Sequence, residues 1–335
     1  MKRPASNKRK IQTSHEEDSI HLDVNEFCEL GEFARAGMEA VKLALERANE
    51  SLADGRIPIS GAAVELTKPG KLKTVTIGHN GRIPPLSGQS GYPTDHGETA
   101  AIREIKDVSK IAWSRVVFAT TLSPCIMCSS ALKWLWKLGL RRVVVAESSS
   151  FAGATLLDEL DGMTVVRLSN LKAQSMMKTF STHYPWDWAA DIGEIPPGDL
   201  TFSQSLETAD ELEEFLKKMH KEMKPGHQAA VVSSEGILAS AEDERPQSGG
   251  NETRSAAMIA MGSAGSQVNL RECVLFFRAS DHSPNVNLDE FGAVSMGACK
   301  LFKPAKVVLT ASPTDELKLS LENAGIQVLV ASVKL

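Results

Sequence analysis

Apolar residues along this chain follow two spacings, one typical of helices and one typical of strands. Between residues 33 and 52 they recur at helical intervals, and the pattern ends at Asp54-Gly55, a frequent helix end. Two strand-like runs, 61–66 and 74–79, flank Lys68-Pro69-Gly70-Lys71, which predicts a hairpin turn. The pattern then predicts helix 97–106, strand 115–121, helix 125–138, strand 141–147, helix 154–161, strand 163–168 and helix 171–183. Such alternation predicts an α/β fold: a three-layer α/β/α domain with a mixed five-stranded sheet.

The same order of elements returns in the second half of the chain. The proline-rich segment 195–199 interrupts the pattern, and a helix with a capping box at Thr208 and Glu211 follows. Beyond it the pattern predicts strands 228–233 and 236–240, helix 252–261, strand 273–279, helix 288–301, strand 306–310, helix 315–324 and strand 326–332. We therefore expect a disordered basic tail at 1–25, one domain at 26–198 and a second domain of similar fold at 199–335.

Composition and charge narrow the class of protein. Of the 335 residues 42% are hydrophobic and 24% charged, as in soluble globular proteins. No apolar run approaches the roughly 18 residues that cross a bilayer, so we expect no membrane partner and a cytoplasmic location, or a nuclear one if Lys8-Arg9-Lys10 acts in import. A net charge of −5 and only two tyrosines disfavour a nucleic-acid partner. These features favour chemistry on a small molecule.

The candidate chemistry lies in two short motifs, His96-Gly97-Glu98 and Pro124-Cys125-Ile126-Met127-Cys128. Cys125 and Cys128 would lie on one face at the start of a helix, where the helix dipole favours thiolates. Two thiolates and one neutral imidazole leave the fourth tetrahedral position of Zn²⁺ free for water. Either motif alone is weak evidence, but together they match the pattern of zinc deaminases. We therefore predict one Zn²⁺ in the first domain, bound by His96, Cys125 and Cys128.

Glu98 is the candidate catalytic residue. It is too close in sequence to His96 to be preferred as a fourth ligand, and a carboxylate beside a zinc-activated water can carry protons. A structural zinc in a non-catalytic scaffold is the alternative, but no fourth protein ligand is evident. The five cysteines, an odd number with a single C-x-x-C pair, favour a metal site over disulfides.

The second half lacks this chemistry. Before its corresponding helices it carries Gly250-Asn251-Glu252-Thr253-Arg254 and Ser283-Pro284-Asn285-Val286-Asn287-Leu288, which supply no imidazole and no pair of thiols. We expect a degenerate, pseudo-catalytic copy of the first domain. The simplest arrangement is an intramolecular pseudo-dimer, in which the second domain packs on the first, and further homo-oligomerisation is left open.

At about residues 30–194 the chain resembles the cytidine deaminase-like superfamily, and within it the fungal-type cytosine deaminases. The resemblance rests on the two zinc motifs and on further segments: Gly78-His79-Asn80, Thr121-Leu122-Ser123, Val144-Val145-x-Glu147 with Phe151, and Asp187-Trp188-x-x-Asp191-Ile192-Gly193-Glu194. It implies zinc-dependent hydrolysis of cytosine to uracil and ammonia. Fungal-type cytosine deaminases are single-domain homodimers, so the second half of this chain departs from their pattern.

The resemblance also implies a set of substrate-binding residues. Asn80 and the backbone N–H of Gly97 would hold the ring carbonyl, and the Ser123 carbonyl and the Asp191 carboxylate would accept from the exocyclic amine. Packing on the base would come from three side chains, those of Ile59, Phe151 and Trp188. Two alternatives stay open: a deaminase of another aminated heterocycle, such as a purine base or a pathway intermediate, and a tRNA or RNA-editing deaminase. The acidic charge balance counts against the second.

Overall fold

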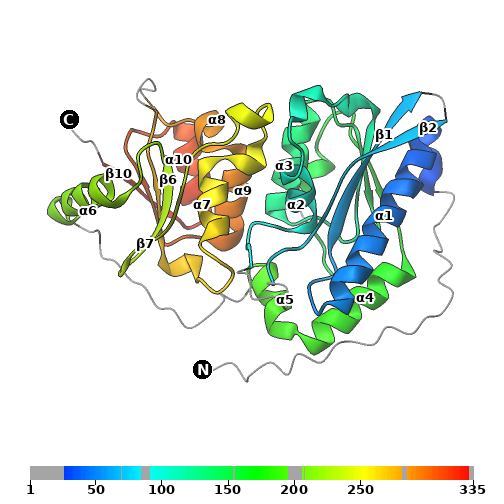
Figure 1. The fold of residues 1–335 in the computed structure, drawn as a ribbon, viewed down its shortest axis with the longest axis horizontal. Coiled ribbons are helices and arrows are strands. Elements are labelled where there is room, and N and C mark those ends of the chain that lie inside the picture. Colours follow the sequence, from blue (N-terminus) through cyan, green and yellow to red (C-terminus); the bar gives the residue numbers. More distant parts are fainter. Residues whose placement is uncertain are drawn as a thin grey trace.

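A computed structural model describes residues 26–68, 70–83, 91–153, 155–194, 206, 208–280 and 285–331. The tail at 1–25 and the predicted domain boundary at 195–199 lie outside these described residues. The described chain forms two α/β units side by side, each built on one five-stranded sheet (Figure 1).

The first sheet has the order β2-β1-β3-β4-β5. Its strands are β1 (Ser60–Lys68), β2 (Lys71–His79), β3 (Val116–Thr120), β4 (Arg142–Val145) and β5 (Thr164–Arg167). Strand β1 runs antiparallel to both β2 and β3, whereas β3, β4 and β5 are parallel. The mixed five-stranded sheet predicted from the sequence is therefore confirmed.

Helices cover both faces of this sheet. After the 3-10 segment η1 (Glu26–Phe33), α1 (Ala34–Ala53) and α4 (Leu171–His183) share one apolar core, and α2 (Gly97–Arg103) and α3 (Ile126–Lys137) share the other. A short helix, α5 (Pro185–Asp191), follows α4. The predicted helix 154–161 is wrong beyond the 3-10 turn Thr155–Leu157, because the chain turns over residues 158–162 and Gly162 adopts a φ of 66°.

The second sheet repeats the first, with the order β10-β9-β8-β6-β7. Its strands are β6 (Ala229–Ser233), β7 (Gly236–Ala241), β8 (Val274–Phe277), β9 (Lys306–Leu309) and β10 (Gln327–Val330). Its helices are α6 (Ala209–Glu222), α7 (Ala256–Ser263), α8 (Leu288–Phe291), α9 (Ala293–Phe302) and α10 (Asp315–Glu322). The capping box of Thr208 and Glu211 is confirmed. The single helix predicted at 288–301 is wrong, because Gly292, with a φ of 96°, separates α8 from α9.

The two units meet where α2 and α3 face α7 and α9 (Figure 1). Helices α3 and α9 approach closely at Gly297, where a Cβ would lie 2.6 Å from Ser130 Oγ and 3.0 Å from Met127 Cα. One apolar core extends through both units. Residues of the second unit also cap α2, since the Asn251 amide donates to the Ile102 carbonyl at 2.8 Å.

Candidate active site

The candidate site lies where the N-termini of α2 and α3 meet the ends of β1 and β3. His96 is the N-cap residue of α2, and Cys125 is the N-cap residue of α3. Gly97 lets α2 approach β1, because a Cβ there would lie 2.6 Å from the Ser60 Cα. The two motifs are far apart in the sequence, and the packing of both helices against neighbouring strands brings them together.

The three predicted metal ligands lie together. One ligand atom each of His96, Cys125 and Cys128 falls within 4.8 Å of the other two, and all three residues are buried. His96 Nδ1 is 3.4 Å from Cys125 Sγ. A tetrahedral zinc with ordinary Zn–N and Zn–S bonds holds such a pair about 3.6 Å apart. The donor set and its spacing therefore fit Zn²⁺.

The charges around His96 are those of a metal site. Burial lowers the pKa of His96, but the Asp191 carboxylate and the Cys125 sulfur outweigh it and raise that pKa to about 9. A hydrogen bond from Cys128, with help from His96, holds the pKa of Cys125 well below its ordinary value. Burial raises the pKa of Cys128. A bound divalent cation would replace the protons held here.

Glu98 lies beside the ligands on the first turn of α2. It is 2% exposed, and its Oε1 is 2.6 Å from the hydroxyl of Thr120, the last residue of β3. Burial raises the pKa of Glu98, and the Thr120 hydrogen bond opposes that shift. Burial thus favours the protonated form of Glu98, the direction expected for a carboxylate that takes up a proton during the reaction.

A small cavity opens beside His96 and Glu98. Its lining consists of Ile59, His96, Glu98, Leu122, Ser123, Cys125, Phe151, Trp188, Asp191 and Ile192. The rings of Phe151 and Trp188 meet edge to face, with centroids 6.0 Å apart. Asp191 Oδ1 lies 3.4 Å from His96 Nε2, so the end of α5 delivers a carboxylate to the metal ligand.

Asn80 and Gly97 lie next to this cavity without being among the residues that line it. The amide nitrogen of Asn80 donates to both oxygens of Asp191, at 2.9 and 3.1 Å. The amide oxygen of Asn80 accepts from the Arg82 backbone N–H at 3.0 Å. Asn80 is thus fixed beside Asp191, and the fold brings all the predicted site residues into one region.

Four residues near the site were not predicted from the sequence. Leu122 and Ile192 line the cavity, and both stand inside motifs already noted, so their positions gave a usable signal. Thr120 touches Glu98. Phe302, from α9 of the second unit, places its ring edge to face with His96 at a centroid distance of 6.5 Å. No sequence signal links it to His96, because the contact depends on how the two units pack.

Comparison with known proteins agrees with this site. Residues 35–147 match the cytidine and deoxycytidylate deaminase zinc-binding region. A cytosine deaminase from Candida albicans is 31% identical over 156 residues, which cover 47% of this chain and 96% of that protein. Two solved structures also match part of the chain. One is a guanine deaminase from Nitrosomonas europaea (22% identity, 44% of this chain, 84% of that chain, TM-score 0.31). The other concerns A-to-I editing by tRNA:A34 deaminases at the wobble position (18%, 39%, 97%, TM-score 0.27).

The zinc-binding region and the cysteine–histidine cluster define a zinc-dependent hydrolytic deaminase. The chain belongs to the cytidine deaminase-like superfamily, as the extent of its match to the Candida albicans enzyme shows. The resemblance to this superfamily, identified in the sequence, is therefore confirmed. Among the helices of the described residues, none is both long enough and apolar enough to cross a membrane.

Proposed function

We propose that this protein deaminates a free aminopyrimidine base, and that cytosine, converted to uracil and ammonia, is its substrate. The observation that carries the proposal is the Asp191 carboxylate, held 3.4 Å from the metal ligand His96 inside a small cavity. An ionised carboxylate only accepts hydrogen bonds, so it suits an exocyclic amine directed toward the metal. The relative from Candida albicans is a cytosine deaminase.

Each side chain of the site has a proposed role in this reaction. Zinc, when bound to His96, Cys125 and Cys128, would supply a Lewis acid that makes water nucleophilic at neutral pH. Glu98 would carry one proton from water to the ring nitrogen and a second to the departing ammonia. Its burial and its hydrogen bond with Thr120 support this role.

The remaining residues would bind and orient the base. Asn80 and the Gly97 N–H would hold the ring carbonyl, and Ser123 would accept from the amine beside Asp191. The cavity wall of Ile59, Phe151 and Trp188 supports a planar apolar ligand. Three of the residues that line this small cavity, Trp188, Asp191 and Ile192, come from α5 and its C-cap. The small size of the cavity supports a free base as the substrate over a nucleotide within a polymer.

We also propose that residues 26–198 and 199–335 are two domains that form an intramolecular pseudo-dimer. The packing of α3 against α9 and the shared core support this arrangement. The second domain would then take the place of a second subunit, and each chain would hold one zinc. A cytoplasmic location, with the nucleus as a second compartment, stays a prediction.

Ammonia release by the purified, zinc-loaded protein tests the function. The panel is cytosine, cytidine, adenine, guanine and a short RNA, with the Glu98→Gln variant as the blank. We expect turnover of cytosine that disappears in the blank and weakens in Asp191→Asn. Turnover of a purine base or of RNA, with no turnover of cytosine, would show that cytosine is not the substrate. The deamination reaction itself would stand. A zinc-loaded protein that is silent on the whole panel would contradict the proposal.

A further inference from the structure

The strand register aligns the two units residue by residue. In the first sheet Gly61 lies opposite Gly78 and Thr120, and in the second Ala229 lies opposite Ala241 and Phe277. Counting on from Gly78 and Ala241, Asn80 corresponds to Asp243, and Arg82 corresponds to Arg245. The local geometry agrees, because the Arg82 N–H donates to the Asn80 side chain at 3.0 Å and the Arg245 N–H donates to the Asp243 side chain at 2.9 Å.

The helix starts extend this alignment to the metal ligands. Ser255 is the N-cap residue of α7, as His96 is of α2, and Gly292 is the N-cap residue of α9, as Cys125 is of α3. Ser295 then corresponds to Cys128. These positions correct the sequence-based alignment, which placed the counterparts at 250–254 and 283–288. The helices begin later than that because α8 and the 3-10 turn Glu252–Arg254 come first.

Ser255 and Ser295, the counterparts of the zinc ligands His96 and Cys128, are hydrogen-bonded to each other. The hydroxyls of Ser255 and Ser295 lie 2.7 Å apart, and both residues are fully buried. A hydroxyl pair that satisfies itself in this way offers no anionic ligand to a metal. Within the described part of the chain, His96, Cys125 and Cys128 make up the one group of three that could hold an ion.

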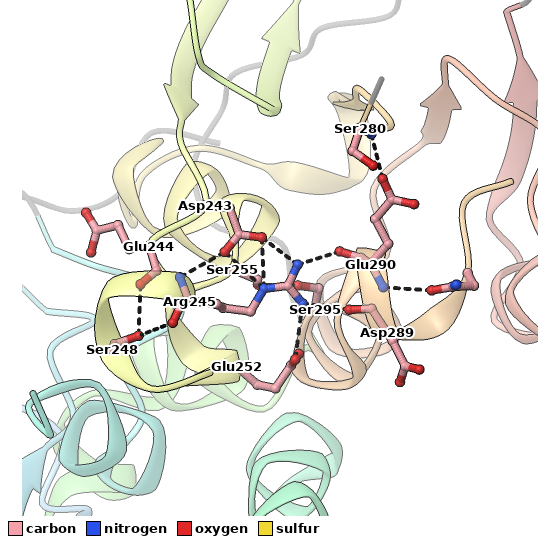
Figure 2. Close-up of polar contacts among 11 residues, drawn as sticks. Asp243, Glu244, Arg245, Ser248, Glu252, Ser255, Ser280, Asp289, Glu290 and Ser295 are labelled. Atoms are coloured by element: carbon pink, nitrogen blue, oxygen red, sulfur yellow. Dashed lines mark hydrogen bonds and ion pairs between the residues drawn. The ribbon is translucent and has the colours of Figure 1, made fainter. Parts of the chain in front are cut away.

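Figure 2 shows the acceptors that surround the Arg245 guanidinium in the second unit. Arg245 Nε donates to both oxygens of Asp243, at 3.0 and 2.8 Å. Nη1 donates to Glu252 Oε1 at 3.1 Å and to the Asp289 carbonyl at 2.7 Å. Nη2 donates to the Glu290 carbonyl at 2.7 Å and to Asp243. All five N–H donors of this guanidinium therefore have an acceptor.

One of these acceptors occupies a position that matters in the first unit. By the strand register, Asp243 stands at the position of Asn80. Asn80 contacts the base in the proposed function, and only this parallel rests on it. We propose that the second unit retains a binding site for a planar guanidinium or amidine cation, and that Arg245 is its built-in occupant.

The site is built for a cation of this shape. Asp243 and Glu252 supply two carboxylates, and the backbone carbonyls of Asp289 and Glu290 accept the N–H groups that these leave. The side chain of Arg245 is 15% exposed. Burial lowers the pKa of Arg245, but Asp243 and Glu252 outweigh it and raise that pKa. The guanidinium thus stays charged, and the wild-type site is closed to a second ligand.

Chemical rescue tests this inference. Arg245→Ala removes the equivalent of ethylguanidinium and leaves two partly buried carboxylates unpaired, so we expect its Tm to fall by roughly 5–10 °C. Millimolar ethylguanidinium chloride should restore most of that loss and saturate. Ethylurea, which has nearly the same shape without the charge, and sodium chloride at equal ionic strength should not. The wild-type protein, whose site is filled, should gain nothing.

Arg167→Ala is the matched control. Arg167 Nη2 donates to both carboxylate oxygens of Asp158, each at 2.8 Å. Both side chains are about 40% exposed, so the Arg167→Ala variant has no enclosed site for a cation. Equal rescue of both variants, or of neither, would overturn the proposal. If Arg245→Ala does not fold, NMR of the ¹⁵N-arginine wild-type protein decides: we expect separate, slowly exchanging Nη–H signals that vanish in Arg245→Lys. Free rotation of that group would overturn the proposal, and neither experiment depends on deaminase activity.

Discussion

The hydroxyl of Thr120 can serve both protonation states of Glu98. It lies 2.6 Å from Glu98 Oε1 and 2.9 Å from the Leu122 carbonyl, and it has a single hydrogen. Against an ionised Glu98 the hydroxyl donates to the carboxylate. When Glu98 is protonated, the carboxyl can donate to the hydroxyl, which then donates to Leu122. A residue that carries protons needs both arrangements, and Thr120→Val removes them without changing the shape of the side chain.

The expected loss follows from the charge on the acceptor. A hydrogen bond to a charged group contributes about 1.5–3 kcal/mol, which corresponds to roughly 10- to 150-fold in kcat. The Thr120 hydrogen bond also lowers the pKa of Glu98 against the effect of burial. Without it that pKa rises further, so Glu98 is protonated at higher pH. The acidic limb of the pH–rate profile should therefore move to higher pH.

The assay is ammonia release as a function of pH, with zinc content measured for each variant. Thr120→Ser keeps the hydroxyl and should retain most of the rate. Thr76→Val is the matched control, because the buried Thr76 hydroxyl donates to the Ala101 carbonyl of the same helix α2 at 2.6 Å, away from Glu98. A Thr120→Val protein with full zinc, an unchanged kcat and an unchanged acidic limb would refute the reasoning, as would an equal loss in Thr76→Val.

Three further predictions concern the metal, a helix cap and the contact between units. Zinc binding needs a neutral His96, and the pKa of His96 without the metal is about 9. Zinc affinity should therefore fall steadily as the pH falls below 9, and equilibrium dialysis would measure it. Thr208→Ala removes the N-cap of α6 and should lower the free energy of unfolding by about 1 kcal/mol in denaturant titrations. Gly297→Ala should cost about 1–3 kcal/mol, because its Cβ would lie 2.6 Å from Ser130 Oγ and 2.8 Å from Ser130 Cβ. Ser130→Gly removes both atoms and should restore part of that loss, and the remainder reflects the Met127 Cα at 3.0 Å.

Sequence periodicity predicted most of the strands, because a buried strand must be apolar over consecutive positions. It also predicted the zinc ligands, since two cysteines three residues apart share a helix face wherever the helix lies. It did not predict the break at Gly292, whose positive φ depends on the path of the backbone. Nor did it predict Phe302 beside His96, which results from packing between units. The alignment of the second half failed because the connections before α7 and α9 differ from those before α2 and α3.

The two units differ in which cation neutralises their buried acidic groups, and this makes a test of reversal possible. In the first unit that cation would be zinc, and in the second it is Arg245. Restoring ligands by Ser255→His, Gly292→Cys and Ser295→Cys should therefore not create a second zinc site. The Arg245 guanidinium would repel the metal, and the φ of 96° at Gly292 disfavours cysteine there. Elemental analysis should give one zinc per chain, and two would show that the ligands alone decide metal binding.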